Sequence, residues 1–201
     1  MTTTQKSILL IVLVLLIDQA SKIYIKLNFA LGENVQVFSW FYIYFIENNG
    51  MAFGMEIISK LFLTLFRMLA VSALAYYIYV LIKKQVRTGY ILTVSLLLAG
   101  AAGNILDSLF YGILFSDSLG HVASFLPVEG GYASLFYGKV VDLFYFPIIT
   151  NSAGETIFFS PIFNVADSAV SVAVVLILLF FRKELNETLD SKKDETPVAE
   201  L

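Results

Sequence analysis

The chain has 201 residues, of which 58% are hydrophobic and only 14% are charged, and its mean hydropathy is +0.81. A soluble domain of this size needs far more polar surface, so we expect one compact integral membrane domain. The absence of cysteine excludes disulfides, zinc thiolates and a cysteine nucleophile, and the single histidine, His121, cannot build a metal site by itself. The net charge of −3 comes without a basic patch, so no nucleic-acid partner is expected.

Four apolar stretches predict membrane-spanning helices, over residues 7–27, 57–82, 90–112 and 163–181. About 20 residues suffice to cross a bilayer. The first stretch could instead be a signal peptide, but no small-x-small cleavage site follows it, and Asp18 and Lys22 would be unusual there. The chain then divides into a four-helix membrane domain, residues 1–183, and a charged tail, residues 184–201, which we expect to be disordered and cytoplasmic.

The two long connections differ in pattern. Within residues 28–56, apolar residues recur at period two, which predicts strands. Residues 113–162 are rich in glycine, serine and aromatic residues and predict irregular structure. The expected fold class is therefore an all-α integral membrane protein, with four transmembrane helices and a small β-rich platform outside the cytoplasm.

The basic residues predict the orientation in the membrane. They gather on one side of the predicted helices, at Lys6, Lys83, Lys84, Arg87, Arg182 and Lys183. The long connections hold little besides Lys139, so the positive-inside rule places both termini in the cytoplasm and both connections outside. In this orientation four carboxylates converge on the outer membrane face: Asp18, Asp107, Asp142 and Asp167.

Asp142 and Asp167 each lie inside an apolar run, which makes them the strongest functional candidates. An ionisable side chain at membrane depth costs roughly 3 kcal/mol or more, so it indicates function. Two carboxylates in one site tend to share a proton, which provides an acid and a base together. This is the chemistry of aspartyl proteolysis.

Other polar residues fall at helical spacing around the two aspartates. Asn164, Asp167, Ser168 and Ser171 form one stripe on the fourth predicted helix. Asn104 and Asp107 share a face of the third helix, near the small residues that favour close helix packing. For Asp107 we favour a structural role in a buried hydrogen-bond network.

Asp18 and Lys22 are four residues apart with the acid first, the favourable order for a helical ion pair, so we favour a structural pair. Arg67 lies about ten residues into the second helix, too deep for an ordinary surface residue. Helical side chains lean toward the N-terminus, here the outer side, so Arg67 can reach the carboxylates or, alternatively, a lipid phosphate.

The remaining features allow two interpretations each. The segment 47–54 includes Asn48 and Gly50; it is equally compatible with a simple turn and with a functional loop. The aromatic residues of both long connections fit a belt at the membrane interface.

With these motifs the chain resembles the lipoprotein signal peptidase (signal peptidase II) family. The matching blocks, in the family's order, are Asp18-Gln19-x-Ser21-Lys22, Asn48-x-Gly50-x-Ala52-Phe53, Gly103-Asn104-x-x-Asp107, Val140-Val141-Asp142 and Phe163-Asn164-x-Ala166-Asp167. The resemblance implies that Asp142 and Asp167 are the catalytic dyad that activates water. It assigns supporting roles to Asp18, Lys22, Asn48, Gly50, Asn104, Asp107, Asn164 and Ala166.

The resemblance further implies an endopeptidase that cleaves diacylglyceryl-modified prolipoproteins just before the lipidated cysteine. No cofactor is implied, and the expected partners are these substrates and membrane lipids. The expected location is the bacterial cytoplasmic (inner) membrane, with the active site toward the outer leaflet, and we expect a monomer. Which aspartate is the acid stays open, because a coupled pair titrates as a unit.

The chain departs from the family at two places. Ser108 occupies the position where the family usually has arginine, so Arg67 could supply this cation by pairing with Asp107 or by contacting the substrate backbone. Residues 113–137 are longer than the usual link, and their contribution is open.

Two other function classes fit less well. A proton-coupled transporter also needs intramembrane carboxylates, but four spans without an inverted repeat give little support for a transporter fold. A Ser–Lys protease built on Ser21 and Lys22 is disfavoured because adjacent helical residues do not face each other.

Overall fold

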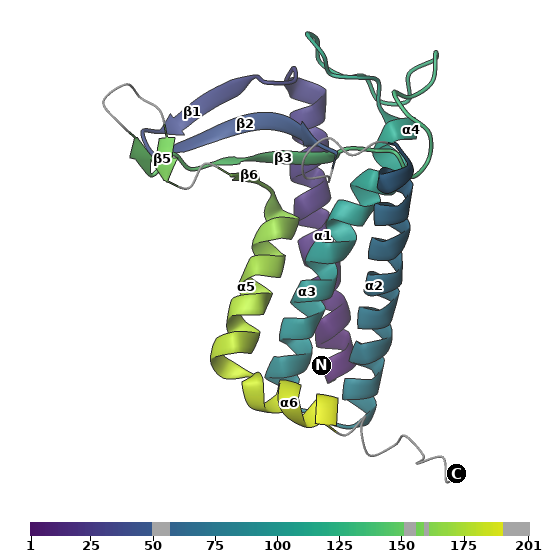
Figure 1. The fold of residues 1–201 in the computed structure, drawn as a ribbon, viewed down its shortest axis with the longest axis vertical. Helices are drawn as coiled ribbons and strands as arrows, with labels where there is room; N and C mark the ends of the chain where they lie inside the picture. The colour runs from purple at the N-terminus through teal and green to yellow at the C-terminus, as the bar shows by residue number, and fades with distance from the viewer. Residues whose placement is uncertain (50–56, 151–155, 159–160, 191–201) are drawn as a thin grey trace.

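The structure, a computed structural model, describes residues 1–49, 57–150, 156–158 and 161–190. Long helices stand side by side and carry a small sheet at one end, opposite the N-terminus (Figure 1). The long helices are α1 (Thr3–Asn28), α2 (Ile57–Lys83), α3 (Thr88–Leu106) and α5 (Val165–Phe180). α3 contacts each of the other three, so it is the central helix of the bundle.

Among the described residues, three helical segments are long and apolar enough to cross a membrane: Thr3–Asn28, Lys60–Lys83 and Thr88–Leu114. α5 meets the same test only together with the start of the next helix, from which it is bent by 88°. Large apolar side chains on the outside of the bundle, such as Phe62 and Leu179, are 70% and 68% exposed. Such a surface is suited to contact with lipid rather than water.

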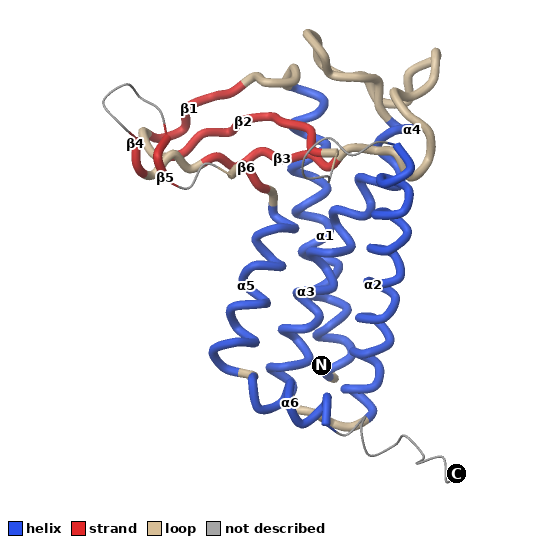
Figure 2. The backbone as a smooth tube through the Cα atoms, in the orientation of Figure 1, coloured by secondary structure: helices blue, strands red, loops and turns tan. Residues whose placement is uncertain are grey.

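The bend leads into α6 (Arg182–Asp190), which lies across the end of the bundle (Figure 2). Leu185 packs against the apolar core there, and the Thr188 hydroxyl lies 2.7 Å from that of Tyr77. The prediction of a disordered tail is therefore wrong for residues 184–190, because these contacts hold the segment as an amphipathic helix. The remainder of the predicted tail, residues 191–201, lies outside the described residues.

The sheet is antiparallel, with strand order β1-β2-β3-β6. Its strands are β1 (Asn34–Phe38), β2 (Phe41–Asn48), β3 (Val140–Tyr145) and β6 (Ile162–Phe163); β4 (Ile149–Thr150) and β5 (Thr156–Phe158) pair separately. β1 and β2 confirm the strands expected within residues 28–56. β3 and β6 lie where irregular structure was predicted, because their pairing partners are distant in sequence. The platform is thus present, but the chain is not all-α.

The two faces of β3 have different surroundings, as the alternation of a strand requires. Val141 and Leu143 belong to a core that also contains Phe45 of β2 and Ile25 at the end of α1. Asp142 belongs to the opposite face, on the side of the helices. This alternation brings one acidic side chain of the sheet to the top of the bundle.

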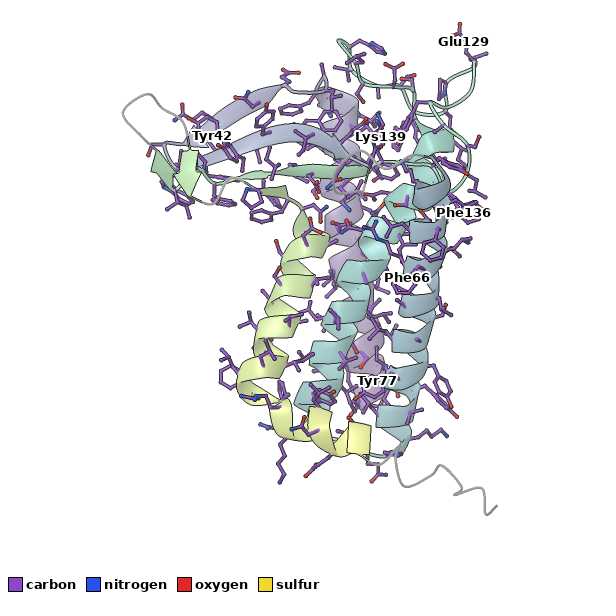
Figure 3. The ribbon with its side chains drawn as sticks, in the orientation of Figure 1. Tyr42, Phe66, Tyr77, Glu129, Phe136 and Lys139 are labelled. Atoms are coloured by element: carbon purple, nitrogen blue, oxygen red, sulfur yellow. The ribbon has the colours of Figure 1, made fainter. Side chains whose placement is uncertain are left out.

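Residues 113–139 pack against the end of the sheet nearest α1 and contact the start of α2. Phe115 and Ala123 belong to the same core as Val141. The carbonyl oxygen of Phe136 accepts a hydrogen bond from the Thr64 hydroxyl of α2, at 3.2 Å. Figure 3 shows Phe136 beside the upper end of α2 and Glu129 at the tip of the segment. This connection therefore covers the apolar core between the sheet and the end of α1.

Candidate active site

A buried charge cluster joins α1 to the end of α3. Lys22 Nζ lies 3.0 Å from Asp18 Oδ2 and 2.8 Å from Asp107 Oδ2, and all three side chains are fully buried. The predicted Asp18–Lys22 pair is thus present, and Asp107 belongs to a buried network. The cation beside Asp107 is Lys22, so the proposed pairing of Arg67 with Asp107 is wrong: α1 supplies the charge that Ser108 lacks.

Gln19 and Tyr111 complete this cluster, and sequence reasoning gave neither a role. Gln19 Nε2 lies 2.9 Å from Asp107 Oδ1 and 3.1 Å from Asp18 Oδ2, and the Tyr111 hydroxyl donates to Gln19 Oε1 at 3.2 Å. Asp107 opens a π-helical turn, η1 (Asp107–Tyr111), which continues into α4 (Gly112–Leu114). Such turns often occur at functional sites. The sequence feature that could have indicated Gln19 is its position directly after Asp18.

The N-terminus of α5 is fixed by a reciprocal cap. Asn164 precedes the helix, and its side chain accepts from the Asp167 backbone N–H at 2.9 Å, while Asp167 Oδ2 accepts from the Asn164 N–H at 3.2 Å. Asp18 Oδ1 accepts the Ala166 N–H at 2.9 Å. Because a helix start leaves its first N–H groups without partners, these bonds set where α5 begins and how Asp167 points.

One asparagine links the two candidate catalytic residues. Asn164 Nδ2 donates to Asp142 Oδ1 at 2.7 Å, and the same residue forms the cap with Asp167. Asn104 Nδ2 donates to Asp167 Oδ1 at 2.7 Å, and Asn104 Oδ1 accepts from Asn164 Nδ2 at 3.0 Å. The structure therefore brings Asp142, Asp167, Asn104 and Asn164 together, as the sequence predicts.

The two carboxyl groups differ in environment. Asp142 is 3% exposed, whereas Asp167 is half-buried. Burial, and after it the nearby charge of Asp167, raise the pKa of Asp142 to about 7. Hydrogen bonds from Asn164 and Asn48, together with the charge of Lys22, act in the opposite direction. Near neutral pH Asp142 can thus hold a proton.

Asp167 is open to two cavities. A cavity of about 320 Å³ lies between α2, α3 and α5; its lining combines Arg67, Asn104 and Asp167 with apolar residues. A second, of about 420 Å³, adjoins the other side of Asp167 and is lined mainly by apolar surface around Phe163. Arg67 thus lies in the same cavity as a candidate catalytic residue.

The β2 end of the site holds the predicted loop residues. Asn48 hydrogen-bonds to Asp142, and Asn49 Oδ1 accepts from Lys60 Nζ at 3.3 Å. Gly50 lies outside the described residues.

A second charge cluster, absent from the sequence prediction, lies on the opposite face of the sheet. Glu47 pairs with buried Lys26 at 2.5 Å and with Lys139 at 3.0 Å. Lys26 Nζ is also surrounded by aromatic rings, with that of Tyr132 4.9 Å away. Figure 3 shows Lys139 where the sheet meets the bundle. The four-residue spacing of Asp18, Lys22 and Lys26 was the signal that could have revealed it.

An acid and a base side by side, next to cavities with apolar walls, can activate water against a peptide bond of an apolar substrate. The chain is similar to several known proteins. The family model described as "Signal peptidase (SPase) II" matches residues 10–182. A lipoprotein signal peptidase of Porphyromonas gingivalis is 44% identical over 92% of this chain and 86% of its own length. One of Amoebophilus asiaticus is 32% identical over 94% and 82%.

Two solved structures of bacterial membrane enzymes share the fold. One has a TM-score of 0.61 at 27% identity, covering 86% of this chain and 90% of its own. The other has a TM-score of 0.59 at 28% identity, covering 96% and 93%. With the apolar helices, these matches identify a multi-pass membrane protein. The chain belongs to the signal peptidase II family, the lipoprotein signal peptidases, and is therefore a membrane protease.

Proposed function

We propose that this chain is an aspartic endopeptidase that removes the signal peptide from diacylglyceryl-modified prolipoproteins by cleaving just before the lipidated cysteine. The observation that carries the proposal is the contact of Asn164 with both Asp142 and Asp167. It holds two carboxyl groups in one site, at the end of an apolar bundle, in a chain of the lipoprotein signal peptidase family.

The reaction follows from the two protonation states. The ionised carboxylate takes a proton from water as the water oxygen attacks the scissile carbonyl carbon, and the protonated carboxyl group donates to the carbonyl oxygen. The tetrahedral intermediate then loses its amine, which takes the proton gained from water, and the carboxyl groups return to their starting states. The two carboxyl groups donate or accept every proton that is transferred in the reaction.

The surroundings of Asp167 support a lipidated substrate. Both adjoining cavities have mostly apolar linings, which suit a signal peptide and acyl chains. In the first, the Arg67 guanidinium can donate to peptide carbonyl groups. The proposed setting is the bacterial inner membrane, with four spans, cytoplasmic termini and the dyad toward the outer leaflet. The proposed partners are prolipoproteins and membrane lipids, with the enzyme acting as a monomer.

Amide substitutions test the dyad. Asp142→Asn and Asp167→Asn keep the size of each side chain but remove its acid–base capacity. We expect each purified variant to lose cleavage of a diacylglyceryl-modified peptide by a factor on the order of 100 or more. Asp117→Asn, which changes a 59% exposed acid in the outer connection, is the matched control and should cleave normally. Substantial turnover by either dyad variant would overturn the proposal.

The two alternative functions can be distinguished from an aspartic peptidase. The Ser21 hydroxyl donates to the backbone carbonyl of Asp18 at 2.8 Å, and Lys22 is held by carboxylates, which argues against a Ser–Lys dyad. A proton-coupled transporter would need an ion gradient. Cleavage in detergent micelles, where no gradient exists, therefore supports a peptidase and contradicts a transporter.

A further inference from the structure

Asp167 accepts a hydrogen bond on each of its carboxyl oxygens. Asn104 Nδ2 donates to Oδ1 at 2.7 Å, and the Asn164 backbone N–H donates to Oδ2 at 3.2 Å. Both partners are donors, so each of the two oxygens is used as an acceptor. The first turn of α5 also favours negative charge, and Arg67 interacts electrostatically with Asp167.

The direction of the Asn104 amide is fixed by Lys22. Asn104 Oδ1 accepts from Lys22 Nζ at 2.8 Å and from Asn164 Nδ2 at 3.0 Å. An ammonium group can only donate, so the amide oxygen must face Lys22 and the amide NH₂ must face Asp167. Lys22 is in turn held by Asp18 and Asp107. Lys22 thereby determines, through Asn104, that a hydrogen-bond donor faces Asp167.

Asp142 also accepts hydrogen bonds, but it is more deeply buried. It belongs to a strand, is 3% exposed, and Asn164 donates to its Oδ1 at 2.7 Å. The charge of Asp167 acts against its ionisation, as does burial; Lys22 and the Asn48 hydrogen bond act for it. The balance raises the pKa of Asp142 to about 7. The two residues are thus unequal before any substrate binds.

We infer that Asp167 is the carboxylate that deprotonates water and Asp142 the acid that protonates the scissile carbonyl oxygen, with Lys22 and Asn104 as the positioning residues that set this division. The inference rests on the proposed dyad. As the C–N bond breaks, the leaving nitrogen takes the proton held by Asp167. Asp142 then recovers its own proton from the hydroxyl group of the intermediate, which leaves a carboxylic acid and the starting enzyme.

The pH dependence of kcat/KM tests this assignment. Its acidic limb should report Asp167 and its alkaline limb Asp142. Asn104→Ala removes a donor to Asp167 and should move the acidic limb to higher pH by about one unit or more. Asn48→Ala removes a donor to Asp142 and should move the alkaline limb upward instead. The reverse assignment exchanges the two limbs, so that exchange would overturn the inference.

Infrared spectroscopy of the carboxyl C=O band gives a readout that needs no activity, in case Asn104→Ala does not fold. The band that titrates near pH 7 should be lost in Asp142→Asn and should persist, with a lower midpoint, in Asp167→Asn. Loss in Asp167→Asn and persistence in Asp142→Asn would contradict the assignment. If both variants are inactive and only the bands are reversed, the dyad stands and the division of roles fails.

Discussion

Lys22 has three partners: Asp18 at 3.0 Å, Asp107 at 2.8 Å and Asn104 at 2.8 Å. These match the three donors of an ammonium group, so a fully buried lysine is satisfied without water. Removing the Lys22 charge would leave two buried carboxylates without their cation, which costs more stability than the intact cluster. The position of this α1 side chain also sets the direction of the Asn104 amide beside Asp167 on α5.

The contribution of Arg67 to catalysis can be tested by substitution. Arg67→Ala removes the cation from the cavity that Asp167 lines, and with it a donor for substrate carbonyl groups. A hydrogen bond to a charged group contributes roughly 1.5–3 kcal/mol, so kcat/KM should fall about tenfold or more. Arg67→Lys should keep part of the activity. Arg87→Ala, at a 66% exposed arginine, is the control; an unchanged kcat/KM in Arg67→Ala would exclude a role in substrate binding.

At the scale of elements, the small residues of α3 set how closely the helices approach. A Cβ atom built on Gly103 would lie 2.6 Å from Asp18 Oδ2 and 3.0 Å from the Ala166 Cβ. At Gly100 it would collide with the Ala166 carbonyl oxygen. Only glycine allows α1 and α5 to meet against α3 at the level of the charge cluster.

Gly103→Ala should therefore destabilise the protein and reduce activity, although alanine ordinarily favours a helix by roughly 1 kcal/mol over glycine. The added methyl group must displace Asp18 and the start of α5. Thermal unfolding in detergent measures the effect. Gly89→Ala, in the first turn of the same helix, meets only the movable ring of Phe181 and should be far milder. Equal effects at the two positions would contradict the close approach as the cause.

Glu47 joins β2 to α1 and to the long outer connection. Burial alone would raise its pKa, but Lys26 and Lys139 outweigh burial and hold the pKa below its usual value. A depressed pKa means that the pair contributes stability above the unfolded value of about 4.3 and loses it as the pH falls further. The stability of the core around Lys26 and Glu47 should thus decrease at acidic pH.

Glu47→Gln should destabilise the protein by about 3–5 kcal/mol, because it leaves Lys26 charged and uncompensated inside an aromatic core. The double variant Lys26→Met with Glu47→Gln removes both charges and should be more stable than Glu47→Gln alone. Unfolding midpoints at neutral pH decide between them. A double variant less stable than the single one would show that the ion pair is not the reason for the loss.

At the scale of the whole molecule, the sheet extends sideways beyond α5 (Figure 1). Aromatic rings are stacked along it: Trp40 lies 5.9 Å from Phe146, which lies 4.7 Å from Phe41. Trp40 is 53% exposed. Exposed aromatic rings beside the lipid-facing part of a protein are typical of the membrane interface, as the sequence predicts. The dyad lies between this platform and the bundle.

Cysteine labelling can test the orientation, because the chain has no cysteine of its own. A cysteine at Ser134, in the outer connection, should react with an impermeant thiol reagent added to intact cells. A cysteine at Gln85, in the α2–α3 turn, should react only after the membrane is opened. Both positions are exposed. The reverse pattern would invert the topology that the distribution of lysine and arginine predicts.

The sequence by itself indicated the long helices, the strands within residues 28–56 and the two candidate catalytic aspartates. Apolar runs of sufficient length favour helices that can cross a membrane, and carboxylates within apolar runs are too costly without a function. The ion pair of Asp18 with Lys22 also followed, because its spacing is local to one helix.

Only the tertiary structure decided which groups meet across elements. β3 is a strand because β2 pairs with it, and Asp107 is held by Lys22 rather than Arg67 because α1 crosses α3 at Gly103. The inequality of Asp142 and Asp167 arises in the same way. Both are aspartates in apolar runs, but one lies in a buried strand and the other caps a helix under the Asn104 amide. Hydrogen-bond direction and burial depend on neighbours distant in sequence, which no local pattern records.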